Sequence, residues 1–470
     1  MTAEDSGARS AVAAYDRAGS AVAVAPKTSF IDGTRSMQPG TGRHRVVILG
    51  GGFGGLKAAT SLASAPVDVT LVDQRNFHLF QPLLYQVATG GLSPANIASP
   101  LRSLVRRQQN CRVVLGKAVD VDLELNELIL EDGRIPFDTL VVAAGASHSY
   151  FGKPEWERFA PGLKTIEDAT EIRRRILTAY EQAEKTNNLE LKKRLLRFIV
   201  IGGGPTGVEL AGTMIEIARH TLKKDFRRVD PSEAHVLMIE AGPRLLAAFD
   251  EDLSAKALES LHRLGVDVRL NTMVTDVCEN GVTVKTGDVS QTLPAATVVW
   301  AAGVQGAAIG AALTREAGVE RDRAGRLVVL PDFSLPGHDN VFVIGDLSSY
   351  KKPDGRMLPG VAPVAMQAGI YVAAVITARL SGAPSPEFHF KDPGSMATIG
   401  RGSAVVKLGR WKFSGYFAWL TWLFVHLMFL VQFQNRLLVL MQWAWSYVTF
   451  NRSARLITDT NRFRSESATS

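Results

Sequence analysis

A glycine-rich turn near residue 50 has the residue types and spacing of a nucleotide phosphate site. Gly50, Gly52 and Gly55 form a GxGxxG pattern directly after the apolar run 46–49, and eighteen residues beyond Gly55 a second apolar run ends in Asp73. The first glycine permits a tight turn, the second lets the backbone approach a pyrophosphate, and the third lets the following helix pack closely on the strand. The N-terminus of that helix would bind the phosphates, and Asp73 would accept hydrogen bonds from ribose hydroxyls. We therefore predict a dinucleotide site here.

The same pattern recurs later in the chain. Gly202, Gly204 and Gly207 repeat the spacing, and the next apolar run ends in Glu240. A carboxylate suits the unphosphorylated ribose of NAD, because a 2′-phosphate would meet like charge, although Arg244 leaves NADP open. Two loops indicate that a resident and a visiting dinucleotide meet for hydride transfer, and a flavin fits the resident role because side chains offer no hydride acceptor. The alternative is a duplicated fold with one inactive site.

The segments around the loops predict an α/β protein with two Rossmann-like dinucleotide-binding domains. Apolar runs at 140–146 and 298–304 are typical of strands and follow the first and second loops, and 340–346 is a third such strand. Residues 167–185 have the pattern of an amphipathic helix that leads into the second unit. At the end of the third strand, Asp346 could hold the ribityl hydroxyls of a flavin or be an ordinary aspartate before a turn.

Charge and aromatic residues are unevenly distributed along the chain. Its 470 residues are 21% charged and 46% apolar, as in an ordinary globular protein, and the formal net charge is +7. Nine Lys or Arg, two acidic residues and five of the seven tryptophans fall from Arg401 onward, so the first 400 residues are neutral overall. A basic, tryptophan-rich, apolar segment suits an anionic membrane surface. We expect no nucleic-acid partner, because the main body has no basic excess.

Residues 413–435 form a 23-residue stretch without charge, which is long enough to span a bilayer. Basic residues flank both ends, and a return span would have only 15 residues. The segment after the stretch carries a polar stripe at Gln442, Ser446 and Thr449, in line with Asn435 at helical spacing. We therefore predict two amphipathic helices lying in one leaflet, with a spanning helix as the alternative.

The remaining features exclude several kinds of site. Cys111 and Cys278 have no CxxC spacing, so we expect neither a disulfide nor a dithiol centre, but two buried thiols acting as small apolar side chains. No His/Cys cluster has metal-ligand spacing, and no metal is expected. Residues 1–43 are rich in Ala, Ser and Gly without a long apolar run, which favours a disordered extension over a signal peptide.

Taken together, these motifs resemble the flavin-dependent pyridine nucleotide–disulfide reductase superfamily. The closer resemblance is to the type II NADH dehydrogenases, the single-subunit, non-proton-pumping NADH:quinone oxidoreductases, and it covers about residues 44–460. The missing dithiol separates the chain from disulfide reductases and from sulfide:quinone oxidoreductases. The more specific motifs are NFHLFQPLLYQVATGGLSP (76–94), GGGPTGVELAG (202–212), VFVIGD (341–346) and SMATIGR (395–401).

The resemblance implies a tightly bound, non-covalent FAD and NADH as co-substrate. It divides the chain into an FAD-binding domain (44–163 and 325–400), an NADH-binding domain (164–324) and a membrane-association segment (401–470). Val119 would contact the adenine through its backbone, and Asp346 would hold the ribityl chain. The other implied contacts are those of Gly50, Gly52, Phe53, Gly54, Gly55, Asp73, Gly145 and Gly345 with FAD, and of Gly202, Gly204, Pro205, Thr206, Gly207, Glu240 and Gly303 with NADH.

The catalytic residues that the resemblance implies are Glu209 and Gln367. We place Glu209 in the first turn of the second helix, where it is either a carboxylate stabilised by the helix dipole or a group that delivers protons for quinone reduction. The family's quinone end usually reads AQxAxQ, whereas this chain reads APVAMQ, with Pro363 in place of the first glutamine. Proline has no side-chain hydrogen bond to offer, which leaves recognition of the quinone headgroup open. His78 and Tyr85 could also function near the flavin, although a structural role is favoured.

The implied reaction passes two electrons from NADH through FAD to a membrane quinone, either menaquinone or ubiquinone. The resemblance further implies a homodimer bound through its C-terminus to the cytoplasmic face of the cell membrane. Two alternatives stay open. One is a soluble ferredoxin- or rubredoxin-type reductase, which the apolar tail disfavours, and the other is a membrane-docked flavoprotein that senses NADH.

Overall fold

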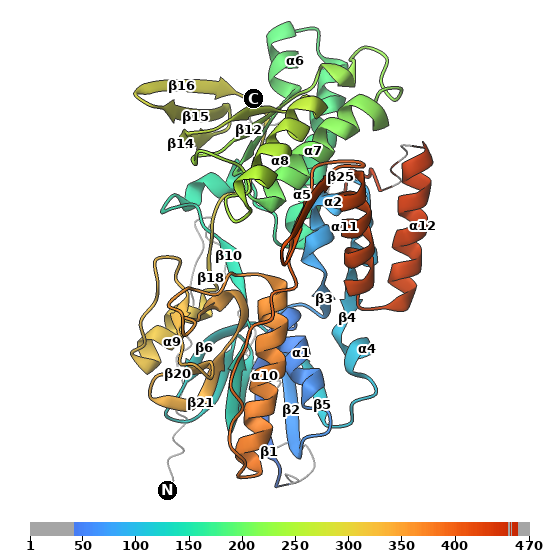
Figure 1. Ribbon diagram of the computed structural model, residues 1–470. Coiled ribbons are helices and arrows are strands. Elements are labelled where there is room, and N and C mark those ends of the chain that lie inside the picture. Colours follow the sequence, from blue (N-terminus) through green and yellow to red (C-terminus); the bar gives the residue numbers. More distant parts are fainter. Residues whose placement is uncertain (1–41, 450–451, 453, 459–470) are drawn as a thin grey trace, which may run out of the picture.

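The computed structural model describes residues 42–449, 452 and 454–458, so the predicted disordered extension lies outside the described residues apart from its last two positions. Two α/β domains are stacked, with two strands running between them and two C-terminal helices, α11 (Tyr416–Phe429) and α12 (Phe433–Thr449), at one side (Figure 1). The fold class predicted from the sequence, two Rossmann-like domains with a helical C-terminal segment, is confirmed.

The first domain is built on a six-stranded sheet in which all strands but the edge strand β20 run parallel. Helices α1 (Phe53–Ser61) and α10 (Ala362–Leu380) pack on each other and share the apolar core of this sheet. In sheet order the strands are β20 (Ser334–Leu335), β21 (His338–Val343), β9 (Thr139–Val142), β1 (His44–Leu49), β2 (Val67–Asp73) and β5 (Cys111–Leu115).

The second domain repeats the arrangement with a four-stranded parallel sheet. Helices α5 (Ile166–Lys185), α7 (Pro205–Glu216) and α8 (Glu251–Leu264) contribute to its core, and α6 (Leu189–Leu195) precedes its central strand. In sheet order the strands are β13 (Asp267–Arg269), β12 (His235–Ile239), β11 (Arg197–Ile201) and β17 (Thr297–Trp300), and an antiparallel sheet adds β14 (Thr272–Cys278), β15 (Gly281–Thr286) and β16 (Val289–Pro294).

The chain crosses between the domains twice. Strands β10 (Ala146–His148) and β18 (Val304–Gly306) pair antiparallel as these two connections, which Figure 1 shows between the sheets. Strands of the first sheet therefore come from two segments of the chain, one before and one after the strands of the second sheet. The exact domain boundaries stay a prediction. The smaller elements outside the two parallel sheets include β3 (Phe77–Leu79), α2 (Leu84–Ala88), α3 (Pro94–Ile97), β4 (Ala98–Pro100), α4 (Leu101–Val105), β6 (Ala118–Asp122), β7 (Glu127–Leu130), β8 (Gly133–Pro136), α9 (Ile309–Ala317), β19 (Leu327–Val328) and β22 (Ser348–Ser349), and α2 packs on α5 and α7 of the second domain.

The uncharged stretch 413–435 is not one helix. It begins in β25 (Trp411–Gly415), the last strand of a sheet formed with β23 (Ser395–Thr398) and β24 (Ala404–Leu408). It continues as α11 (Tyr416–Phe429), breaks at 430–432 and enters α12 (Phe433–Thr449). The described helix with the length and hydropathy to cross a membrane is α10, whose buried side chains belong to the core of the first domain.

The two cysteines only partly match the expectation of buried thiols. Cys111 is half-buried at the start of β5, and burial raises the pKa of its thiol to about 11. Cys278 is exposed, because β14 is an edge strand of the small antiparallel sheet and its last residue faces solvent. The prediction was therefore wrong for Cys278.

Candidate functional site

The first glycine loop makes a turn that a side chain would block. Gly50 has a φ of +106°, and a Cβ atom there would lie 2.3 Å from the carbonyl oxygen of Ala143. A Cβ atom on Gly55 would lie 1.8 Å from the carbonyl oxygen of Gly50, so α1 packs directly on the turn. The predicted roles of these two glycines in the turn and in the helix contact therefore agree with the geometry.

The same loop leaves room for a pyrophosphate. No atom lies within 4 Å of where a Cβ of Gly52 would be, and α1 begins there without a side-chain cap. Asp73 lies behind the loop, where its two carboxylate oxygens accept hydrogen bonds from the backbone nitrogens of Gly51 (2.6 Å) and Arg75 (2.7 Å). Burial raises the pKa of Asp73, and these hydrogen bonds oppose the rise. Each oxygen keeps a second lone pair that a ribose hydroxyl could use.

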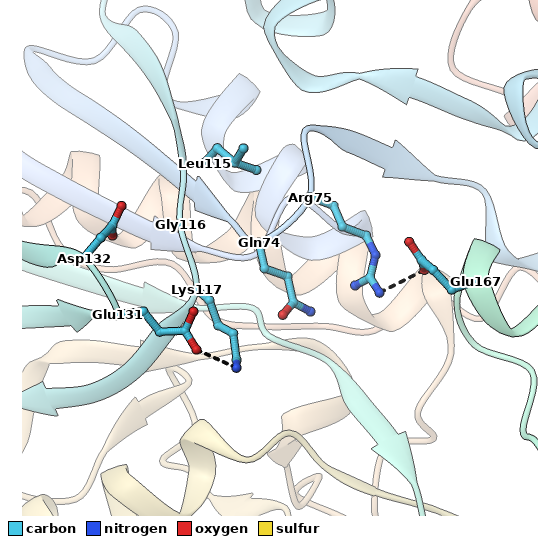
Figure 2. Close-up of a pocket in the computed structure, with 8 residues that line it drawn as sticks. All are labelled: Gln74, Arg75, Leu115, Gly116, Lys117, Glu131, Asp132 and Glu167. Atoms are coloured by element: carbon cyan, nitrogen blue, oxygen red, sulfur yellow. Dashed lines mark hydrogen bonds and ion pairs between the residues drawn. The ribbon is translucent and has the colours of Figure 1, made fainter. Parts of the chain in front are cut away.

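A hollow of about 480 Å³ opens beside Gln74 and Arg75, the two residues that follow Asp73 (Figure 2). Two ion pairs flank it, Arg75–Glu167 at 3.0 Å and Lys117–Glu131 at 2.7 Å. The residues that line it are Gln74, Arg75, Leu115, Gly116, Lys117, Glu131, Asp132 and Glu167.

The next segment, β6, carries Val119 at an irregularity in its pairing with β7. The register passes from Ala118 to Asp120, so Val119 has no partner in the β6–β7 ladder, and its side chain is exposed. A backbone group outside the ladder is what the predicted contact with adenine requires. That contact stays a prediction.

The predicted ribityl end of the site lies where three elements meet. Gly345, with a φ of +72°, turns the chain after β21 and places Asp346 in the following 3₁₀ turn. A Cβ on Gly54 of α1 would lie 3.1 Å from the carbonyl oxygen of Ala365 in α10. Pro363 is in the first turn of α10, where a missing N–H is tolerated, which explains how the helix accommodates it.

Lys164 is a site residue that the sequence pattern did not reveal. Its Nζ atom lies 3.8 Å from an Asp346 carboxylate oxygen, and its side chain is largely buried. Burial lowers the pKa of Lys164, and the charge of Asp346 opposes this effect. The pair joins the start of the second domain to the predicted ribityl site, across 182 residues that no local pattern relates.

Gln367 has a different environment from the one that its predicted quinone role suggests. Its side-chain nitrogen donates to the backbone oxygen of Lys391 (2.8 Å), and its side-chain oxygen accepts from the backbone nitrogen of Lys391 (2.9 Å). The nitrogen and the oxygen of the Gln367 side-chain amide thus both bond to Lys391 and hold the 383–394 segment against α10. This favours a structural role, and the role at the quinone end stays a prediction.

The remaining residues predicted for FAD line the same region. Phe53 begins α1 and makes an edge contact with His78 at 5.1 Å between ring centroids. Gly145 follows β9 with a φ of +70°, and its carbonyl oxygen accepts a hydrogen bond from Ala307 at 3.2 Å. Both residues therefore lie at the end of the first sheet that carries the loop.

The second glycine loop has the geometry of the first. Gly202 has a φ of +109°, and a Cβ there would lie 2.7 Å from the backbone of Ala301. A Cβ on Gly207 would lie 2.0 Å from the carbonyl oxygen of Gly202, whereas Gly204 faces open space. Helix α7 begins at Pro205 without a side-chain cap, so Pro205 and the exposed Thr206 stand at a helix N-terminus open to phosphate.

Glu240 and Arg244 have distinct roles in the second domain. The two carboxylate oxygens of Glu240 accept hydrogen bonds from the backbone nitrogens of Gly203 and Gly242, each at 2.6 Å. The Arg244 guanidinium donates to the backbone oxygens of Phe249 (2.7 Å) and Ala247 (2.9 Å). Arg244 therefore braces the loop before α8, which removes the reason for expecting it to bind a 2′-phosphate.

Glu209 does not lie where the sequence interpretation placed it. Because α7 begins at Pro205, Glu209 is the fifth helical residue, and the first turn of the helix contains no acidic residue. The expected first-turn position was therefore wrong, and with it the explanation by the helix dipole. Burial raises the pKa of Glu209 to about 8, although a long hydrogen bond from the Thr398 backbone nitrogen (3.5 Å) opposes the rise. At neutral pH Glu209 therefore carries a proton.

His78 and Tyr85 are both buried beside these groups. The Nδ1 atom of His78 lies 2.9 Å from the carbonyl oxygen of Gly51 in the first loop, and burial lowers the pKa of His78. Tyr85 accepts a hydrogen bond from Gln86 at 2.9 Å. The pKa of Tyr85 is raised well above its ordinary value, mainly by burial and secondly by the charge that Glu209 carries when it is ionised. Both side chains have structural contacts, in line with the favoured interpretation.

A smaller hollow of about 110 Å³ lies between α7 and the C-terminal helices, with Tyr85 and Thr398 in its wall. Glu216, seven residues after Glu209 on the same face of α7, pairs there with Arg452 at 3.2 Å. The Nε1 atom of Trp422 also belongs to this wall and has no protein partner. Glu216 could have been found from its helical spacing to Glu209, but Arg452 could not.

Only part of the polar stripe predicted on α12 faces the protein body, because Thr449 is exposed. The Nδ2 atom of Asn435 donates to the backbone oxygen of Ala98 at 3.4 Å, and Arg401 donates to the backbone oxygen of Ser446 at 2.8 Å. The opposite side is an apolar surface, which we call the outer face. It consists of Phe417, Leu420, Phe424, Met428, Phe429, Phe433, Leu437, Leu440, Met441, Trp445 and Val448, all of them exposed.

Several basic side chains of the C-terminal segment form ion pairs with acidic residues of the second domain. Lys407 pairs with Asp250 at 2.8 Å, Lys412 pairs with the same carboxylate, and Arg455 pairs with Asp225. The expectation that this charge excess faces an anionic surface is weakened, because acidic residues of the second domain already neutralise part of it.

Comparison with known proteins gives consistent matches over nearly the whole chain. Residues 44–369 match the family described as pyridine nucleotide-disulphide oxidoreductase, and residues 393–452 match the NDH2 C-terminal domain. The chain is 46% identical over 429 residues to the type II NADH:quinone oxidoreductase Ndh of Mycobacterium tuberculosis, a match that covers 90% of this chain and 92% of that protein. It is 30% identical to the type II NADH:quinone oxidoreductase of Staphylococcus haemolyticus, with coverages of 76% and 88%.

Solved structures show the same fold. The structure of NDH2 from Plasmodium falciparum in complex with NADH has a TM-score of 0.80 and 21% identity, and the match covers 89% of this chain and all of that one. The sulfide:quinone oxidoreductase of Aquifex aeolicus has a TM-score of 0.66 at 19% identity.

The chain belongs to the pyridine nucleotide-disulphide oxidoreductase family and, within that family, to the type II NADH:quinone oxidoreductases. This confirms the predicted resemblance, and with it FAD as the cofactor and NADH as its co-substrate.

Proposed function

We propose that the protein is a respiratory NADH:quinone oxidoreductase that takes two electrons from NADH through FAD and delivers them to a membrane quinone. The observation that carries the proposal is the pair of glycine loops in two domains joined by β10 and β18, with the buried acid Glu209 on the helix that follows the second loop. FAD, when bound, supplies the two-electron chemistry that no side chain can provide.

The residues of the two domains bind and position FAD and NADH. The first loop and Asp73 hold the FAD pyrophosphate and ribose, and Asp346 with Lys164 holds its ribityl end. The second loop and Glu240 hold NADH at its pyrophosphate and adenosine ribose.

Glu209 is the group best suited to give a proton at neutral pH. Its pKa of about 8 keeps it protonated in the resting protein and close enough to neutrality to release the proton. Quinone reduction consumes protons, and the hollow beside Tyr85 and Glu216 has the polar lining that water needs to reach this part of α7.

The outer face of α11 and α12 fits a membrane surface. Eleven exposed apolar residues on one side of two helices form a larger apolar area than a monomeric soluble protein usually leaves in water. We propose that this face lies in one leaflet at the cytoplasmic side of the cell membrane, where menaquinone or ubiquinone can enter from the lipid. The family resemblance also supports a homodimer, whereas the ion pairs of Lys407, Lys412 and Arg455 leave less positive charge for an anionic phospholipid surface.

The test of this function is steady oxidation of NADH in vesicles that contain menaquinone or ubiquinone analogues. Sustained turnover that depends on added quinone supports the oxidoreductase. A single reduction followed by a long-lived reduced protein would instead support the alternative of a membrane-docked NADH sensor. Reduction of an added ferredoxin or rubredoxin in preference to quinone would support the soluble reductase.

A further inference from the structure

Phe151 is in an unfavourable position for an ordinary surface residue. Its φ is +50°, a region that bulky side chains rarely adopt, and its side chain is 70% exposed. Among the described residues, four other non-glycine positions have positive φ. Two of them are asparagines, which tolerate this region, and the other two, Leu246 and Phe333, are buried in the core. Phe151 thus combines a strained backbone with an exposed aromatic ring that the fold does not need for burial.

The ring is held over the predicted NADH residue Gly303. A Cβ atom on Gly303 would lie 2.7 Å from the ring atom Cζ of Phe151, so the ring covers the glycine at a distance that only glycine permits. The segment before it is fixed, since the Ser149 backbone nitrogen donates to the Gly303 oxygen (3.4 Å) and the Trp300 indole donates to the Ser149 oxygen (2.9 Å).

The order of strands in the second sheet shows which half of a dinucleotide would lie here. Strand β11, which leads into the glycine loop, lies between β12 and β17. Glu240 follows β12 and Gly303 follows β17, so the two residues are on opposite sides of the loop. A dinucleotide with its adenosine ribose at Glu240 and its pyrophosphate at the loop would place its nicotinamide half over the end of β17. Strand β18 leads from that point to the first domain.

We propose that Phe151 is a positioning residue that packs its ring against the nicotinamide of NADH. This inference rests on the proposed binding of NADH by the second loop. The positive φ places the ring over Gly303, where one side of it also meets the Trp300 ring at 6.0 Å between centroids, and bound nicotinamide would cover the apolar surface that is exposed in its absence. An aromatic ring contributes directional packing to a planar ligand at low cost in side-chain entropy.

The test compares ligand affinity with thermal stability in the FAD-loaded protein. Phe151→Asn removes the ring but tolerates the positive φ, so we expect an unchanged or higher Tm together with an affinity for NAD⁺ that is about 3- to 10-fold weaker in calorimetric titration. ADP-ribose, which lacks nicotinamide, should bind the variant and the parent protein equally. Phe151→Tyr should restore the affinity for NAD⁺.

Two further variants serve as controls for this comparison. Leu189→Asn removes an equally exposed apolar side chain from α6 and should leave both affinities unchanged. Phe151→Leu, which keeps an apolar contact without a ring, should show the same selective loss if the asparagine variant folds poorly. Unchanged NAD⁺ affinity would overturn the proposal, and so would an equal loss for ADP-ribose, which would place the ring over the wrong half. A failure of the proposed function would appear separately, as absent turnover with quinone despite normal NAD⁺ binding.

Discussion

The backbone nitrogen of Thr398 lies 3.5 Å from the Oε1 atom of Glu209, which joins the C-terminal sheet to helix α7 of the second domain. This long hydrogen bond is too weak to offset the burial of the carboxyl group, so the acid stays protonated near neutral pH. The surroundings of Glu209 thus come from two parts of the chain that are 189 residues apart.

The first prediction concerns stability as a function of pH. The pKa of Glu209 is raised from an ordinary 4.5 to about 8 on folding, so the native state binds more protons than the unfolded state between these values. Its contribution to stability is therefore fully present below pH 4.5 and is lost as the pH rises through 8, with a limiting slope of about 1.4 kcal/mol per pH unit. Glu209→Gln should remove this slope in denaturant titrations at pH 6, 7 and 8. Equal slopes in both proteins would show that Glu209 titrates normally.

The second prediction separates the half-reactions of the enzyme. Glu209→Gln should bind FAD normally and be reduced by NADH at close to the parent rate, because the change is isosteric and removes only the titrating proton. Reoxidation by quinone should slow by about 10²- to 10⁴-fold, the usual contribution of a general acid. Stopped-flow absorbance at the flavin band measures each step, and the parent rate of reoxidation should fall above pH 8. If neither step changes, Glu209 is a structural residue.

The third prediction concerns the choice of nucleotide. Glu240→Gln should narrow the preference for NADH over NADPH, because the repulsion of a 2′-phosphate is relieved while the hydrogen bonds to the loop are partly retained. Arg244→Lys is the matched control. It should lower the Tm through loss of the bonds to Phe249 and Ala247 but leave the ratio of kcat/KM values unchanged. If the ratio of kcat/KM values for NADH and NADPH changed only in the Arg244 variant, then Arg244, and not Glu240, would set the nucleotide preference.

The fourth prediction concerns retention of the flavin. Asp346→Ala should weaken binding of FAD, seen as loss of yellow colour during dilution and filtration, because the acid beside Lys164 would no longer hold the ribityl hydroxyls. Asp354→Ala, in the exposed turn bonded to Arg356, is a control of the same chemistry away from the site and should retain FAD. Full retention by the Asp346 variant would remove this residue from the site.

The fifth prediction concerns membrane attachment. Phe417, Phe424 and Phe433 are 76%, 63% and 78% exposed on the outer face. Burial in lipid contributes about 2 kcal/mol for each, so the triple substitution to Ser should release the protein from vesicles in a flotation assay. Reduction of ferricyanide by NADH should persist, whereas activity with a long-tailed quinone should fall.

The control for that experiment addresses charge. Arg410→Gln together with a high-salt wash should release little protein, because several basic residues nearby are already paired with acids of the second domain. Release by salt alone would mean that electrostatic attraction to anionic lipid dominates. A triple serine variant that still floats with the vesicles would contradict attachment through the outer face.

The sequence revealed those parts of the site that depend on local spacing. The turns at Gly50 and Gly202 follow from glycine patterns, since each needs a positive φ and a close backbone contact within a few residues. Lys164 and Arg452 were not found, because their partners Asp346 and Glu216 lie 182 and 236 residues away and only the fold brings them together. Long-range ion pairs of this kind leave no periodic signal in a single sequence.

Local sequence patterns also did not predict where the chain breaks between α11 and α12. The stretch from 417 to 447 contains neither glycine nor proline, so nothing in it indicates where a helix ends. In the structure Leu430 leaves the helical conformation, its side chain is buried in the core, and its carbonyl oxygen accepts a hydrogen bond from Arg436 at 2.7 Å. Tertiary packing therefore ends α11 after Phe429.

The inner side of the C-terminal helices has a practical consequence for anyone who wants this enzyme without detergent. Ala418, Trp422, Leu430 and Val439 belong to the same apolar core as α7 and the second sheet, and Trp443 donates to Gln86 at 2.7 Å. Truncating the chain before residue 416 would therefore remove these packing partners and expose the apolar core around α7 to water. A water-soluble version is better engineered by replacing apolar residues of the outer face with polar ones, without shortening the chain.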